Sequence, residues 1–377
     1  MIQSPGLLLT LLAFVLVIGP LVFVHEMGHY LAGRLFGVKA DTFAIGFGRE
    51  VAGWTDIRGT RWKLGWLPLG GYVKFAGDMN QASQPTAEWL AMPAEERQRT
   101  FQAKPVWQRA IIVAAGPAVN FALAVLILAG FAATIGVDQT PPVVGIVQPN
   151  SAAAAAGLRA GDRIAALGGR SIATYRDLQT YVAMRPGERV AIDIVRGSAP
   201  VTVTATFGQT KLRDRFGNET AIGRLGVGTD RVVYKPVSLL QAPAAGVRMV
   251  ADILRGTLDG LGQIITGRRS LDELGGPLKI AKVSGEQFAL GWTALVLLIA
   301  FVSINLGFIN LLPVPMLDGG HLLFYAIEAI RRRPVAPEVQ DWAYRGGLAA
   351  LLALMLFVTV NDLGSLGLWK NLAGLIG

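Results

Sequence analysis

Cysteine is absent from this chain of 377 residues, which excludes a disulfide framework and any metal site built from thiolates. Charged side chains are scarce as well, because Asp, Glu, Lys and Arg make up 16% of the residues, whereas a soluble domain has about 25%. Much of the surface is therefore predicted not to meet water. Only three His are present, so their placement decides where metal chemistry is possible.

Basic residues exceed acidic residues and give a formal net charge of +9. They are scattered between apolar blocks rather than gathered on one polar domain, so we expect no nucleic-acid partner. Four uncharged apolar runs lie between them, at residues 6–24, 111–137, 287–317 and 346–360. A transmembrane helix needs about 20 apolar residues, and the fourth run reaches that length only if residues 363–369 extend it. The composition predicts a multi-pass α-helical membrane protein with four transmembrane helices in a lipid bilayer.

The distribution of basic residues predicts the orientation of these helices, because short cytoplasmic loops are enriched in Lys and Arg. Residues 1–5 carry no basic residue, which also argues against a cleaved signal peptide. We therefore expect a cytoplasmic loop at residues 31–105 and at the turn that holds Arg331, Arg332 and Arg333, with both termini outside. The ten basic residues of the first loop are Arg34, Lys39, Arg49, Arg58, Arg61, Lys63, Lys74, Arg97, Arg99 and Lys104.

From about residue 142 to 207 the long outer segment changes to strand and turn chemistry, with alternating apolar residues at Val190, Ile192 and Ile194. Residues 151–164 read SAAAAAGLRAGDRI and resemble the AGLxxGDxI signature of bacterial PDZ domains. One extracytoplasmic PDZ-like β-rich domain at residues 138–208 is expected to take an extended peptide ligand as an added strand. A passive spacer is the alternative.

Residues 209–286 are expected to hold a β segment and a juxtamembrane amphipathic helix. The apolar residues of the expected amphipathic helix recur at helical spacing, while charged residues between them exclude a membrane span. This helix is therefore predicted to lie on the outer membrane surface. The apolar positions are Val247, Val250, Leu254, Leu258, Leu261 and Ile265, and the charged positions are Arg248, Asp252, Arg255 and Asp259.

An HExxH pattern, His25-Glu26-Met27-Gly28-His29, follows the first apolar run directly. On a helix, His25 and His29 leave one face about one turn apart and can bind a single Zn²⁺. Glu26 lies beside that face, where it can act as a general base without being a ligand. A polar helix end with two hydrogen-bonded His is the alternative, but ionisable residues within membrane segments are costly and usually functional.

A catalytic zinc ion takes a third protein ligand and keeps one position open. Asp318 is the first carboxylate after the third apolar run, and Pro313 and Pro315 break regular helix before it. Broken backbone at membrane depth is tolerated where it is buried or lines a cavity. We predict Asp318 as the third ligand, and His321 is a rival for that position or a group that orients its neighbours.

Three separated segments carry a family resemblance. They are HEMGHYLAGRLFGVKADTFAIGFG at residues 25–48, AGPAVNF at residues 115–121 and SINLGFINLLPVPMLDGG at residues 303–320. Together with one PDZ-like insert, they resemble the site-2 protease family over nearly the whole chain, and more narrowly the bacterial RseP-type regulated intramembrane zinc metalloproteases.

This resemblance implies zinc held by His25, His29 and Asp318, with Glu26 as the catalytic base. It implies cleavage of transmembrane segments in single-pass membrane proteins, with anti-sigma-factor-like proteins or signal-peptide remnants as substrates. It also implies residence in the bacterial inner membrane, with the active site opening toward the cytoplasm.

The resemblance divides the chain into a first catalytic half at residues 1–137 and a second catalytic half at residues 287–377, which holds the LDG motif. Two departures are visible. Family members often read GFGP where residues 46–49 read GFGR, and the best-known enterobacterial type has two PDZ domains where this sequence has one. Neither departure touches the proposed metal ligands.

Residues 38–47 and 62–75 combine apolar and aromatic residues with glycine turns, and they resemble the family's membrane-associated β-hairpin. The edge of such a hairpin can pair with an unwound substrate strand, and a simple interfacial hairpin is the alternative. The candidate substrate-binding residues there are Gly70, Gly71, Tyr72 and Val73.

Asn120, Asn305 and Asn310 are candidates to donate hydrogen bonds to substrate or to an oxyanion, or else to form polar contacts between helices. Two other classes of function are weighed against an intramembrane protease. A proteolytically silent PDZ scaffold needs neither Glu26 nor a third ligand, and a metal transporter needs ligands along a path. The complete cluster of candidate ligands argues against both.

Overall fold

The computed structural model describes residues 6–77, 89, 91–213, 219–267, 271 and 275–365. Within these residues, the long apolar helices are α1 (Leu7–Leu35), α4 (Val106–Thr134), α9 (Trp292–Asn310) and α11 (Pro337–Ser365). The most apolar 18 residues of each helix are mostly exposed, with buried shares of 22%, 39%, 28% and 17%. Apolar faces this open suit a lipid environment, so the four predicted apolar helices are present in a form that fits a membrane protein.

The third apolar run is not one helix, contrary to the prediction for residues 287–317. Gly291 adopts a positive φ of 109° and separates α8 (Pro277–Leu290) from α9. α9 ends at Asn310, because two prolines in the following segment lack the amide hydrogen that a continuing helix needs. The fourth run is longer than predicted, since α11 begins nine residues before position 346.

The chain forms two compact units. One consists of Met1–Leu128, Gly246–Arg255 and Gly275–Asp362, and is called the helical unit. The other consists of Ala129–Ala245, Gly256–Leu274 and Leu363–Gly377, and is called the β-rich unit. Residues 366–377, part of the predicted second catalytic half, lie outside the described residues.

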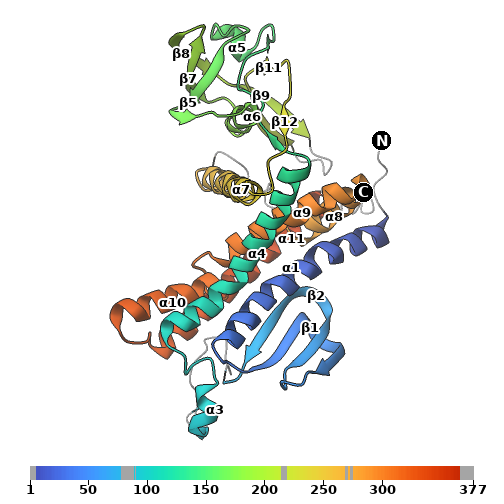
Figure 1. The fold of residues 1–377 in the computed structure, drawn as a ribbon, viewed down its shortest axis with the longest axis vertical. Coiled ribbons are helices and arrows are strands. Elements are labelled where there is room, and N and C mark those ends of the chain that lie inside the picture. Colours follow the sequence, from blue (N-terminus) through green and yellow to red (C-terminus); the bar gives the residue numbers. More distant parts are fainter. Residues whose placement is uncertain are drawn as a thin grey trace, which may run out of the picture. The chain divides into compact units, whose positions relative to one another are not determined.

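The predicted hairpin is present in the helical unit as β1 (Ala40–Thr55) and β2 (Arg61–Phe75). Both strands bend, so that Ile45 pairs with Leu64 on one side and with Gly71 on the other. The bent strands give four segments in the spatial order 50–55, 61–65, 40–47 and 71–75, in which the two outer pairs run in opposite directions and the central pair, 61–64 beside 42–45, runs in the same direction. The segment at residues 71–75 is therefore an edge, and Figure 1 shows the hairpin beside α1.

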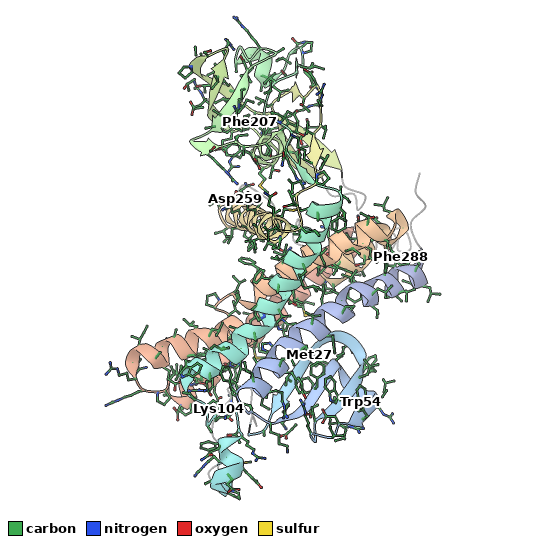
Figure 2. The ribbon with its side chains drawn as sticks, viewed as in Figure 1. Met27, Trp54, Lys104, Phe207, Asp259 and Phe288 are labelled. Carbon is green, nitrogen blue, oxygen red and sulfur yellow. The ribbon has the colours of Figure 1, made fainter. Side chains whose placement is uncertain are left out.

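The hairpin docks on α1 through aromatic side chains. Tyr30 of α1 meets Phe43 at 5.8 Å and Trp62 at 5.5 Å between ring centroids, and these two rings stack on each other at 4.4 Å. Met27, labelled on α1 in Figure 2, packs against the same cluster. Because aromatic pairs add stability beyond their buried area, this cluster fixes the hairpin against the helix that carries the HExxH pattern.

Three apolar clusters hold the helical unit together. The first joins α1, the hairpin, α4 and α10 (Asp318–Arg331), and includes Phe43, Ile112 and Tyr325. The second joins α4, α9 and the first half of α7 (Ala242–Ile265) around Val250. The third joins α1 with α8 and α9. α4 contributes to all three clusters and α1 to two of them. A short helix, α3 (Ala94–Gln98), lies between the hairpin and α4 in the chain.

The β-rich unit contains a four-stranded sheet in the order β6-β5-β7-β8 and several short pairs. Its core includes Phe207, labelled in Figure 2, and also Leu225, with Val227 packed against it. This core extends past residue 208, so the boundary predicted there falls inside the unit. Its elements are β3 (Val137–Asp138), β4 (Ile146–Val147), α5 (Ala152–Ala155), β5 (Arg163–Leu167), β6 (Arg170–Ser171), α6 (Tyr175–Ala183), β7 (Arg189–Arg196), β8 (Ala199–Thr206), β9 (Gly208–Arg213), β10 (Glu219–Arg224), β11 (Val227–Gly228) and β12 (Tyr234–Lys235).

The predicted amphipathic helix is present as α7. Val250 is buried, whereas Val247 and Leu258 are each 54% exposed and Ile265 is 84% exposed. Its apolar face thus remains partly open, as the sequence pattern predicts for a helix that lies on a membrane surface.

Candidate metal centre

His25 and His29 project from consecutive turns of α1, which runs without interruption from the apolar run through the HExxH pattern. Their Nε2 atoms lie 3.2 Å apart. Both residues are buried, with 8% and 9% exposure, and Glu26 between them is 8% exposed. The continuous helix therefore places two imidazole nitrogens at one point beneath the surface, as the i, i+4 spacing predicts.

Asp318 is the first residue of α10 and faces the two His. Its Oδ2 lies 3.2 Å from Nε2 of His25 and 3.5 Å from Nε2 of His29. The loop before it folds back tightly, because Gly319 and Gly320 have no side chain: a Cβ on Gly319 would lie 2.2 Å from the Leu312 carbonyl oxygen. This close approach sets the direction from which Asp318 meets the His pair.

The three donors fit a zinc ion. Zinc binds His nitrogen and carboxylate oxygen at about 2.0–2.2 Å, so two ligands of a tetrahedral site lie about 3.3 Å apart. The distances between the three donor atoms, 3.2, 3.2 and 3.5 Å, match that separation. Oδ2 of Asp318 is also buried without a hydrogen-bond partner, which is costly unless a cation lies there. His25, His29 and Asp318 together can therefore hold one zinc ion.

The second nitrogen of each imidazole is held by α4. Nδ1 of His29 lies 2.9 Å from the Ile112 carbonyl oxygen, and Nδ1 of His25 lies 3.1 Å from Nδ2 of Asn120. Oδ1 of Asn120 is buried without a partner. When His25 binds a metal through Nε2, its Nδ1 carries the proton and needs an acceptor. Rotation of the Asn120 amide by 180° exchanges its nitrogen and oxygen and provides that acceptor. Asn120 thus lies where it orients His25, a role that the sequence alone did not single out.

Glycines allow α1 and α4 to approach closely at the metal centre. A Cβ on Gly116 would lie 2.3 Å from Nε2 of His29, and a Cβ on Gly28 would lie 2.5 Å from the Ala115 carbonyl oxygen. Any side chain at position 116 would therefore enter the space of the metal ligand. The sequence offered a signal for this residue, the AGPAVNF run, but no reason for its glycine.

His321 does not join the cluster. It lies on α10, where the hydroxyl of Tyr344 on α11 is 2.9 Å from its Nδ1. Its position therefore ties α10 to α11, and the geometry favours Asp318 over His321 as the third ligand. Asn305 donates to the Phe301 carbonyl one turn earlier on α9, and Asn310 is the last residue of that helix.

Glu26 is held between the His pair and the hairpin edge. Its carboxylate accepts a hydrogen bond from the backbone of Val73, and a Cβ on Gly71 would lie 2.9 Å from its Cγ. Glycine at position 71 therefore lets the edge strand reach the carboxylate. Gly70 has a φ of +91° and lies under the Phe47 ring, which stacks on Tyr72 at 6.3 Å. Gly71 and Val73 thus meet Glu26, while Gly70 and Tyr72 contact Phe47.

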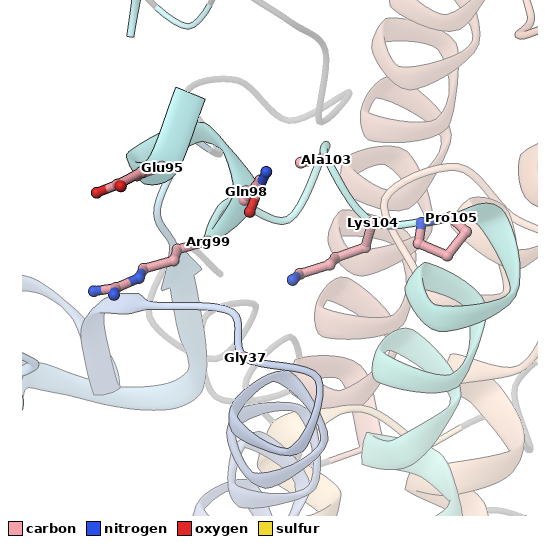
Figure 3. A pocket seen from close by; sticks show the side chains of 7 residues that line it. All are labelled: Gly37, Glu95, Gln98, Arg99, Ala103, Lys104 and Pro105. Carbon is pink, nitrogen blue, oxygen red and sulfur yellow. The ribbon is translucent and has the colours of Figure 1, made fainter. Parts of the chain in front are cut away.

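A surface hollow of about 580 Å³ lies apart from the three ligands, between the C-terminal end of α1 and the N-terminal end of α4. Figure 3 shows its lining, which includes Glu95, Arg99 and Lys104. Its lining contains none of the predicted catalytic or ligand residues.

Comparisons with known proteins bear on this centre. The model of the family described as Peptidase family M50 matches residues 13–354. A protein of Agrobacterium fabrum named as a candidate zinc metalloprotease is 45% identical over 361 residues, covering 94% of this chain and 95% of its own length. A protein of Rhizobium meliloti with the same description is 44% identical, covering 94% and 96%. Metalloprotease MmpA of Caulobacter vibrioides is 38% identical, covering 98% and 99%.

Proposed function

The chain belongs to peptidase family M50 and is a zinc metalloprotease, and we propose that it cleaves transmembrane segments of single-pass membrane proteins. The observation that carries this proposal is the position of the catalytic pattern inside an apolar helix. His25, Glu26 and His29 lie in α1, a candidate membrane span, and each is less than a tenth exposed. A peptide bond that reaches these residues has to approach through the apolar part of the molecule, which favours a substrate that is itself in the bilayer.

We assign the zinc ligands as His25, His29 and Asp318. Bound zinc supplies Lewis acidity toward the scissile carbonyl and toward the attacking water. Glu26 accepts the proton of that water on its carboxylate and then returns it to the nitrogen of the leaving amine. Asn120 and the Ile112 carbonyl keep the two imidazoles oriented through both proton transfers.

The hairpin edge at residues 71–75 is proposed to hold the substrate backbone. A peptide bond within a helix is already hydrogen-bonded, so the helix has to open before water reaches its carbonyl. An edge strand offers the opened segment new backbone partners. The contact between Val73 and Glu26 supports this assignment, because a strand added at this edge would run past the general base. Asn310, at the end of α9, is a further candidate for substrate contact.

The β-rich unit is proposed to be a PDZ-like filter for peptide segments outside the membrane. Support comes from β11, which pairs with β4 on one edge, and from the hydroxyl of Tyr175 on α6, which donates to the Val227 carbonyl at 2.8 Å. On this proposal β11 and α6 would form the two walls of a groove, and an extended peptide would add to the strand. A bound peptide strand would compete with the Tyr175 hydroxyl for that carbonyl.

The proposed setting is the bacterial inner membrane, with the hairpin and the Arg331, Arg332 and Arg333 turn on the cytoplasmic side and both termini outside. The excess of basic residues in these segments supports this orientation. Substrates of the anti-sigma-factor or signal-peptide-remnant kind, in regulated intramembrane proteolysis, are the class that the resemblance favours.

The test is purified Glu26→Gln in detergent, with zinc content and cleavage of a single-pass substrate measured together. We expect zinc to be retained and cleavage to fall by about 10²–10⁴-fold, the usual share of a general base. Glu95→Gln, on the exposed helix α3, is the matched control and should cleave normally. Loss of zinc from Glu26→Gln would refute the role as base. Equal cleavage of a soluble peptide with the same sequence would refute the restriction to membrane substrates.

A further inference from the structure

We propose that Arg109 and Glu328 form a positioning pair that holds Asp318 against the two His ligands; this inference rests on the proposed zinc ligand set. Nη2 of Arg109 lies 2.8 Å from Oε1 of Glu328, and the two side chains are 15% and 19% exposed. Nε of Arg109 also donates to the Lys104 carbonyl at 3.2 Å, and the guanidinium lies 4.9 Å from the centre of the Tyr325 ring. An arginine with three partners has little freedom to move.

Both Glu328 and Tyr325 lie on α10, the helix that begins at Asp318. A helix of this length behaves as a stiff rod, so fixing its later turns also fixes its first residue. The tight loop before Asp318 sets the direction of this residue but needs support from outside the loop, because Met316 there adopts a positive φ of 81°. Such a conformation persists only where surrounding contacts hold it.

On α4, Arg109 belongs to the stripe that meets the metal centre. Ile112, Gly116 and Asn120 follow it by three, seven and eleven residues, which is the spacing of one helix face. Ile112 and Asn120 orient His29 and His25, and Gly116 makes room for His29. Arg109 on the same face of α4 contacts Glu328 and Tyr325 on α10. One helix, α4, therefore sets the positions of all three proposed zinc ligands.

The test uses the full-length protein in detergent, with two measurements that need no cleavage. One is the zinc affinity in competition with a chelator. The other is backbone hydrogen exchange of α10 and α1 in the zinc-free protein. We expect Arg109→Gln to lower zinc affinity about tenfold, within the range seen when a group that orients a ligand is lost, and to raise exchange in the first turns of α10 while α1 keeps its protection. Glu328→Gln should have a smaller effect in the same direction, because its amide oxygen still accepts a hydrogen bond.

The control is Arg170→Gln, which removes the exposed pair with Asp259 in the β-rich unit and should leave both readouts unchanged. Wild-type zinc affinity and α10 exchange in Arg109→Gln would overturn the proposal, as would an equal loss of protection in α10 and α1, which means general destabilisation. Asp318→Ala is measured in parallel. If Asp318→Ala keeps its zinc, the proposed ligand set is wrong. If Asp318→Ala loses its zinc while Arg109→Gln behaves as the wild type, only the positioning pair is rejected.

Discussion

Asp162 in the β-rich unit and Asp318 in the helical unit are both carboxylates removed from water, and their surroundings differ. Asp162 accepts two hydrogen bonds at 2.8 Å from Arg196 and one from the backbone of Arg159. Asp318 instead presents Oδ2 to two imidazole nitrogens without a hydrogen bond to it. A carboxylate with all its partners stabilises a fold, whereas one left open among nitrogen donors is placed for a cation.

The backbone around the two carboxylates differs in the same way. The turns beside Asp162 use Gly157 and Gly161, with φ values of +74° and +89° that glycine adopts without strain. The loop before Asp318 uses Met316 at φ +81°, where a side chain makes the conformation costly. The turns beside Asp162 thus avoid backbone strain, whereas the loop before Asp318 accepts it next to the proposed metal centre.

The largest effect is expected at the open carboxylate. Asp318→Ala removes one of three proposed ligands, so zinc content should fall below a tenth of the wild-type value and cleavage should be abolished. Metal analysis of the purified variant, beside a folding check by circular dichroism, measures this. His321→Ala is the matched control on the same helix and should keep its zinc and a measurable part of the activity. Zinc lost from His321→Ala but kept by Asp318→Ala would show that His321, and not Asp318, is the third ligand.

A single methyl group should disturb the same centre. Gly116→Ala places a Cβ in the space of Nε2 of His29, so we expect zinc affinity and cleavage to fall about 10–100-fold. Gly130→Ala, later on α4, has no atom within 4 Å of its new Cβ and should have no effect on either quantity. Chelator competition on both variants decides the matter. Equal affinities would mean that α4 can move away from His29 at little cost.

Substitution of Asp162, whose carboxylate has its hydrogen-bond partners, should lower the stability of the β-rich unit without changing zinc affinity. Hydrogen bonds from Arg196 hold the pKa of Asp162 below its ordinary value, so its stabilisation is complete above the pKa of an unfolded Asp, about 4, and is lost as the pH falls through the lower folded value. We expect Asp162→Asn to reduce the free energy of opening of the β-rich unit by about 2 kcal/mol at pH 7. The wild type should approach this variant as the pH is lowered below 4.

Hydrogen exchange of β5 and β7 in the full-length protein, followed against pH, measures that difference. Asp193→Asn is the control, because the Asp193 carboxylate accepts its hydrogen bond from Thr202 on an exposed face of the sheet. Its protection should stay close to that of the wild type. A constant gap between wild type and Asp162→Asn at every pH would exclude the ionised carboxylate as the cause.

The smallest effect on cleavage is expected when residues 140–232, which form most of the β-rich unit, are removed together. Gln139 donates to the Val233 carbonyl at 2.8 Å, so excision of residues 140–232 with a short linker joins points that are already neighbours. Cleavage of a short membrane substrate should stay within about threefold of wild type, since this region is proposed to filter and not to catalyse. Excision of residues 142–207 alone would leave Leu225 without its core and serves as a contrast. An inactive but folded, zinc-loaded excision variant would place the region within the catalytic machinery.

Features that depend on neighbours in the chain could be predicted from the sequence. Apolar runs identified the four long helices, and the i, i+4 spacing placed His25 and His29 on one face. The break at Gly291 was not predicted, because a glycine within an apolar run is compatible with either a continuous helix or an interruption. The end of the β-rich core beyond residue 208 was missed for a related reason, since short strands such as β11 have too few residues to show alternation.

The sequence by itself therefore determined the membrane character of the chain, the HExxH pair and the expectation of a carboxylate near the broken end of the third apolar run. Only the tertiary structure decided that Asp318 and not His321 faces the pair, that Asn120 and Ile112 orient the imidazoles, and that the hairpin edge reaches Glu26. These contacts join segments far apart in the chain, and they depend on how closely two helices can pack. Local periodicity carries no information about the distance between α1 and α4. Glycines such as Gly116 allow the close approach of these helices, and only the packing shows which glycines have this effect.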